Sequence, residues 1–185
     1  MVQIQAPMWL VEKHNKVPEM LKGFFGNVSD LIQYLRSEKY IREATAEKWD
    51  GKIKQAYEYL DKYDIMTALK EVFDVTKGMQ LVIDRIKSDA FWKNQPVPDP
   101  LRKQLEALAG SLREFLSVLL DMVDYYANTY RSPPIVQASW SEKVNGAYFL
   151  LQRGDLDGAI GDIIIIMKDL QPLLDEIRNQ LPKIN

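Results

Sequence analysis

The chain has 185 residues, of which 46% are hydrophobic and 27% are charged, and its formal net charge is −2. This composition is typical of a globular protein and excludes wholesale disorder. The near balance of 24 basic and 26 acidic residues argues against a duplex nucleic-acid binder, which normally has a strong basic excess. Because the chain has no cysteine, disulfides, thiolate chemistry and zinc sites with sulfur ligands are excluded.

The first residues predict an N-terminal arm over residues 1–16. No positively charged leader precedes an apolar run there, so no signal peptide is expected. The most apolar run of the chain, residues 159–167, is far shorter than the roughly 20 residues of a membrane-spanning helix. We therefore expect a soluble, cytoplasmic protein with no membrane partner. His14, the only histidine, is expected to be exposed on the arm, where Trp9 and Leu10 form an apolar anchor.

Helical periodicity predicts three helices in the first half. Pro18 suits the first turn of a helix that runs to about residue 36, with apolar residues spaced as on one buried helical face. A second helix is expected over residues 45–62. Asp64 is placed to cap a third helix over residues 65–87, because its side chain can accept an N–H of the first turn.

A Pro-rich linker is predicted over residues 91–100, with Phe91 and Trp92 fixing it to the core. A long helix follows and ends near residue 130, since the residue before a proline avoids the helical conformation. Ser139 and Glu142 have the spacing of a capping box that opens a fifth helix.

The last helix is predicted to start at Gly154-Asp155, which closes the fifth helix and caps the sixth. Its isoleucine-rich sequence should make it the most buried element of the fold. Pro172 is expected to kink this helix or to start a new turn.

The chain contains an internal repeat. Residues 49–87 align with residues 140–178 without a gap, at an offset of 91. A further segment, 107–119, resembles residues 23–35 at an offset of 84. No alternating strand pattern is present. We therefore predict an all-α fold of six main helices, in which a duplicated three-helix unit (residues 17–90 and 101–185) forms a helical bundle with pseudo-twofold symmetry. Identities in register include Trp49 and Trp140, Ala56-Tyr57 and Ala147-Tyr148, and Asp64 and Asp155.

The sequence contains no catalytic motif. With a single histidine, expected on the N-terminal arm, neither a Ser-His-Asp triad nor a two-histidine metal site is expected, and no glycine-rich phosphate loop is present. Asp155 and Asp157 fall in the first turn of a helix, where acidic side chains stabilise the helix dipole. We therefore predict a non-enzymatic protein without a metal or cofactor.

These features favour a helical interaction or assembly module that self-associates or docks into a larger complex. Two alternatives remain. One is a structural subunit that coats nucleic acid, such as a virion coat, for which the basic cluster over residues 39–54 is weakened by interleaved acids. The other is a small-molecule binder with a pocket between the repeats. The predicted contact residues are Trp9 and Leu10, followed by the tyrosines expected to be exposed, Tyr59, Tyr63 and Tyr126.

Overall fold

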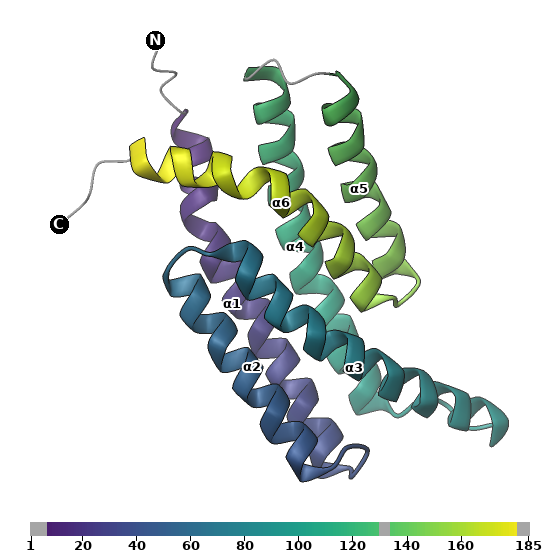
Figure 1. Cartoon of the computed structure of the whole chain (residues 1–185). Coiled ribbons are helices and arrows are strands. Elements are labelled where there is room, and N and C mark those ends of the chain that lie inside the picture. The colour runs from purple at the N-terminus through teal and green to yellow at the C-terminus, as the bar shows by residue number, and fades with distance from the viewer. Residues whose placement is uncertain (1–6, 130–133, 181–185) are drawn as a thin grey trace.

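The computed structural model of the protein describes residues 7–129 and 134–180. Within these ranges the chain forms six helices and no strand, which confirms the all-α prediction (Figure 1). No helix in the part described has a stretch long and apolar enough to cross a bilayer. The helices are α1 (Met8–Ser37), α2 (Glu43–Asp61), α3 (Ile65–Trp92), α4 (Asp99–Thr129), α5 (Pro134–Gln152) and α6 (Leu156–Gln180).

The six helices pack in a closed ring of neighbours. α1 contacts α2 and α4, α3 contacts α2 and α6, and α5 contacts α4 and α6. One hydrophobic cluster fills the inside of this ring and takes residues from every helix, including Phe24 of α1, Ile83 of α3 and Phe115 of α4. The two predicted three-helix units therefore share a single core.

Helix α1 begins earlier than the sequence indicates. Residues 8–16, expected as an arm, form its first turns, and Leu10 and His14 are buried there. Pro18 consequently lies inside the helix and has no N–H to donate to the His14 carbonyl four residues earlier. The Tyr63 hydroxyl donates to that carbonyl instead, at 2.8 Å. The helix continues through the proline because a side chain from another part of the chain replaces the missing donor.

The start of α5 also differs from the prediction. α5 begins at Pro134, so Ser139 lies inside the helix and the predicted capping box is wrong. A proline is tolerated at the first helical position because that N–H has no intrahelical acceptor. α6 continues through Pro172 to Gln180, and its C-terminal part runs at an angle to the rest, in agreement with the predicted kink (Figure 1). α6 also has an outward face, since Ile165 is 50% exposed.

The turns that precede α3 and α6 follow the predicted capping scheme. The Asp64 side chain accepts from the Thr67 N–H at 3.1 Å, and the Asp155 side chain accepts from the Gly158 N–H at 3.0 Å. Gly154 has a φ of 77°, which suits glycine. Tyr63 has a φ of 61° at the corresponding position, which costs roughly 1–2 kcal/mol for a residue with a side chain. Contacts of the tyrosine side chain must offset that cost.

Candidate functional site

Three of the five predicted contact residues are buried inside the chain. Leu10 and Tyr126 are 0% exposed and Tyr63 is 8% exposed, so the expected exposure of the two tyrosines is wrong. Tyr126 continues the buried stripe of α4, three residues after Val123 and seven after Leu119. Tyr63 lies in the turn between α2 and α3. Tyr59 is half-buried. Trp9 is 42% exposed and packs edge-on against Tyr125, with ring centroids 5.6 Å apart.

His14 is buried, in contrast to the expected exposed position. Its ring stacks on Tyr63 with centroids 4.6 Å apart, and Nε2 lies 2.8 Å from the Leu174 carbonyl oxygen. Because a carbonyl only accepts, Nε2 carries the proton, and Nδ1 has no hydrogen-bond partner among residues 7–129 and 134–180. Burial lowers the pKa of His14, against the opposing effect of the hydrogen bond to Leu174. The neutral imidazole therefore joins α1 to α6.

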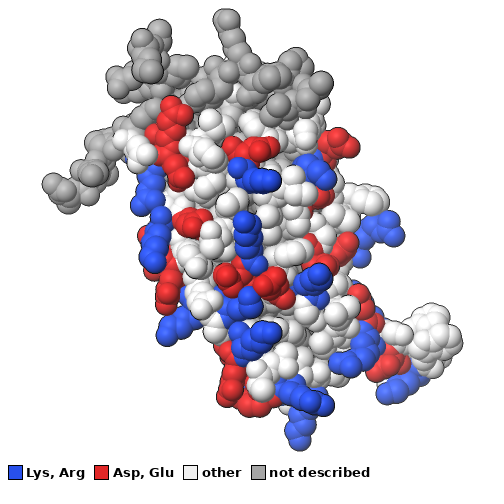
Figure 2. Space-filling view, viewed as in Figure 1, with Lys and Arg blue, Asp and Glu red and all other residues white. Residues whose placement is uncertain are grey.

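The C-terminal end of α3 projects beyond the bundle (Figure 1). It carries Phe91 and Trp92, which are 75% and 80% exposed and pack edge to face with centroids 5.5 Å apart. We call these two residues the α3 tip. The prediction that they fix a linker to the core is wrong, because α3 continues as a helix to Trp92 and carries both rings outward. Figure 2 shows a protruding surface of uncharged residues (white, lower right) at this end of the molecule, with basic and acidic side chains beside it.

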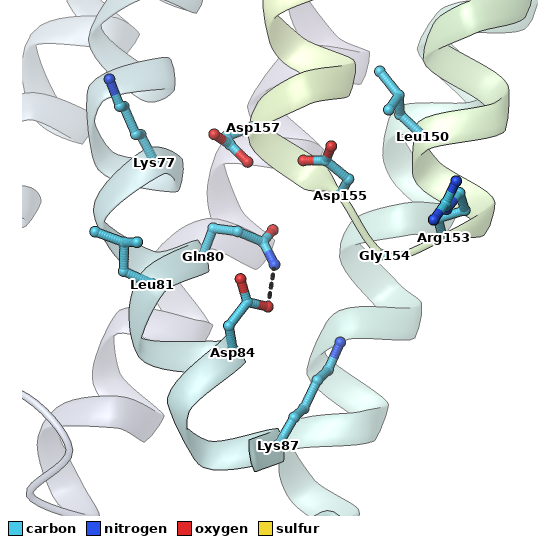
Figure 3. Close-up of a pocket in the computed structure, with 10 residues that line it drawn as sticks. All are labelled: Lys77, Gln80, Leu81, Asp84, Lys87, Leu150, Arg153, Gly154, Asp155 and Asp157. Carbon is cyan, nitrogen blue, oxygen red and sulfur yellow. Dashed lines mark hydrogen bonds between the residues drawn. The ribbon is translucent and has the colours of Figure 1, made fainter.

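A groove of about 640 Å³ lies between α3 and the turn that joins α5 to α6 (Figure 3). It is thus formed by both predicted repeats. Leu81, which is 72% exposed, lies at its outer edge. Three cations and three carboxylates line it, so it has no net formal charge. The α3 side consists of Lys77, Gln80, Leu81, Asp84 and Lys87, and the opposite side of Leu150, Arg153, Gly154, Asp155 and Asp157.

Gln80 fixes the floor of the groove. Its Oε1 accepts from the Leu156 N–H in the first turn of α6 at 3.1 Å, and its Nε2 donates to Asp84 at 2.9 Å. Burial, followed by the nearby Asp155 carboxyl, raises the pKa of Asp157. In the part of the chain that the structure describes, no group of three or more His, Asp or Glu side chains is placed to hold a metal ion.

The corresponding position beside the first turn of α3 is filled by side chains. Gln171 Oε1 accepts from the Met66 N–H at 3.2 Å, much as Gln80 accepts from α6. Tyr63 aligns with Gly154 at the offset of 91, and the Arg178 guanidinium lies 5.1 Å from the Tyr63 ring. Arg178 also donates to the Lys62 carbonyl at 2.9 Å.

Gly154 lies in the wall of the groove and has no side chain to enter it. A Cβ there would lie 3.4 Å from Lys87 Nζ, and Figure 3 shows Lys87 directed toward this turn. Sequence reasoning did not single out this groove or the glutamines that flank the two turns. Gln80 and Gln171 are identical at the offset of 91, so the internal repeat contains the signal.

Comparison of the chain with protein-family models, with curated proteins and with solved structures found no match.

Proposed function

We propose that this protein is a non-enzymatic helical interaction module that self-associates through the α3 tip. The observation that carries this proposal is the exposure of Phe91 and Trp92, 75% and 80%, at the end of a regular helix. Large aromatic side chains bury roughly 150–250 Å² each and dominate interface energetics. Burial of such a side chain in an interface would contribute about 1.5–3 kcal/mol of hydrophobic free energy relative to its exposed state.

The helical setting of the tip supports an interaction role. Phe91 and Trp92 have two rotatable side-chain bonds each and stand on a helix whose backbone is already ordered. Little conformational entropy is therefore lost when a partner covers them. Trp is also the residue type most enriched among interface residues that dominate affinity. Trp9 stays a predicted contact residue, whereas Leu10 is committed to the core of its own chain.

We further infer that the module arose by duplication, with its two halves facing each other across a pseudo-twofold axis. The hydroxyls of Tyr57 and Tyr148 donate to the carbonyls of Lys22 and Arg113 respectively. Both the donors and the acceptors are 91 residues apart. These contacts favour aligning α1 with α4 at an offset of 91 residues, the offset of the other two helices. The sequence comparison predicted an offset of 84 for this pair. The reciprocal capping of α6 by Gln80 and of α3 by Gln171 also supports a twofold relation.

The nucleic-acid-coating alternative gains no support from the basic cluster over residues 39–54. Lys52 pairs with Glu71 at 3.1 Å and with Asp74 at 2.8 Å, and Arg36 beside the cluster pairs with Glu43. A cation that pairs with carboxylates of its own chain is less available to phosphates. The measurement that would revive this alternative is binding to single-stranded nucleic acid that weakens steeply with salt.

The proposed function is tested by measuring mass in solution by light scattering over a range of protein concentrations. We expect the wild-type mass to rise above the 21.4 kDa of one chain. Phe91→Ser with Trp92→Ser should abolish the rise, because it removes the apolar surface without touching the core. Met8→Ser is the matched control, since Met8 is 72% exposed on α1. Either a wild-type protein that stays monomeric or a tip variant that associates like wild type would contradict the proposal.

A further inference from the structure

We infer that the α3 tip of one copy docks in the groove of a second copy. The two copies then pair about a twofold axis that passes beside residues 86–87 of α3. This inference rests on the proposed self-association and names the surface that receives the tip. It predicts a closed dimer with two identical contacts, each consisting of one tip and one groove.

The tip and the groove occupy matching faces of the same helix. Trp92 follows Leu81 by eleven residues, which places the two side chains within roughly 20° of each other around α3 and about 16 Å apart along it. Phe91 follows Asp84 by seven residues, so the two side chains leave α3 within roughly 20° of each other. Asp84 lines the groove, and Phe91 therefore lies on the groove side of α3. A twofold axis near residues 86–87 therefore brings Trp92 of each copy onto Leu81 of the other. Phe91 then faces the groove.

The stretch between tip and groove permits two α3 helices to lie antiparallel. Four residues between Leu81 and the α3 tip are exposed (Asp84, Arg85, Ser88 and Asp89), and of these Arg85 and Ser88 lie nearest to the direction of Leu81 around the helix. The twofold axis places Arg85 of one copy opposite Ser88 of the other, so the two arginines do not meet. A small serine at the centre allows the axes to approach to about 8–10 Å.

The groove offers the environment that an aromatic ring has in the other half of the molecule. Beside α3, the equivalent space holds the Tyr63 ring under the Arg178 guanidinium. In the groove, Leu150 offers an apolar surface, and Lys87 and Arg153 supply cations at the wall. Cations attract the face of an aromatic ring. The incoming Phe91 would take the place that Gly154 leaves open.

The expected interface is small. With about three quarters of each aromatic side chain exposed, burial of Phe91 and Trp92 would remove roughly 300 Å² per copy from water. The grooves would contribute a similar area, giving a total of about 1,200 Å², at the lower limit of stable interfaces. We therefore expect a dissociation constant in the micromolar range.

The test compares variants of the two surfaces by sedimentation and light scattering of the full chain. Gly154→Tyr fills the groove, and its backbone conformation is one that a tyrosine already adopts at residue 63. Leu81→Glu changes the exposed edge of the groove without touching the core. Its matched control is Ile165→Glu, an exposed aliphatic residue on α6. Circular dichroism would verify that each variant is folded.

We expect wild type and Ile165→Glu to reach twice the 21.4 kDa chain mass. Both groove variants and the double tip variant should weaken association more than about 100-fold, since buried aromatic contacts dominate such interfaces. If only the tip variant lost association, the proposed function would stand and docking into the groove would be wrong. A tip variant with wild-type mass, or a monomeric wild type, would overturn both. Growth beyond two copies would overturn the closed twofold pairing.

Discussion

Replacing Tyr63 by phenylalanine should destabilise the fold through the loss of a single hydrogen bond. The Tyr63 hydroxyl donates to the His14 carbonyl at 2.8 Å, and Pro18 leaves that carbonyl without a helical donor. The phenylalanine ring can keep the stacking on His14, so packing is nearly unchanged. An unsatisfied buried acceptor costs about 1–3 kcal/mol. For a domain of this size, each 1 kcal/mol lowers Tm by about 2–4 °C.

The matched control is Tyr57→Phe. The Tyr57 hydroxyl donates to the Lys22 carbonyl at 3.1 Å, but that carbonyl keeps the N–H of Gly26 inside α1. The variant should therefore lose less than about 1 kcal/mol. Urea unfolding followed by tryptophan fluorescence and circular dichroism measures both changes.

A double-mutant cycle isolates the cause. Pro18→Ala supplies the missing N–H to the His14 carbonyl, so Tyr63→Phe should cost less than half as much in that background. If Tyr63→Phe costs the same with alanine as with proline at position 18, the hydroxyl does not replace the proline's missing donor. A cost no larger than that of Tyr57→Phe would lead to the same conclusion.

Two further predictions concern glycine packing and the buried histidine. Gly78→Ala places a methyl group 2.7 Å from Trp49 Cζ2 and should lower the free energy of unfolding by about 1–3 kcal/mol. Gly51→Ala meets nothing within 4 Å and should raise it by up to about 1 kcal/mol; urea unfolding that gives both variants the same sign would contradict this. Because burial lowers the pKa of His14 below 6.5, the unfolded chain binds a proton that the folded chain does not. The free energy of unfolding should therefore fall as pH drops through 6.5 toward the lower folded pKa, and His14→Leu should remove this dependence. A wild-type stability that is flat between about pH 7.5 and about pH 5.5 would refute the assignment.

The sequence determined the features of this fold that depend on local interactions. Periodic apolar residues identified the six helices, because a helix with one buried face needs that spacing. Asp64 and Asp155 were recognisable as caps, since a cap bonds an N–H only three residues away. Gln80 and Gln171 are also identical in the internal repeat. The contact that each makes with the other half of the chain is visible only in the folded structure.

Only the tertiary structure decided which side chains are covered and which space stays open. Pro18 lies inside α1 because Tyr63, 45 positions further along, donates in place of its N–H. Tyr63, in the turn between α2 and α3, is buried, whereas Trp92 at the end of α3 is exposed. The groove likewise forms only where α3 meets the turn between α5 and α6. Burial, and with it the candidate site, depends on which distant segments meet, and residue spacing along one helix does not encode that meeting.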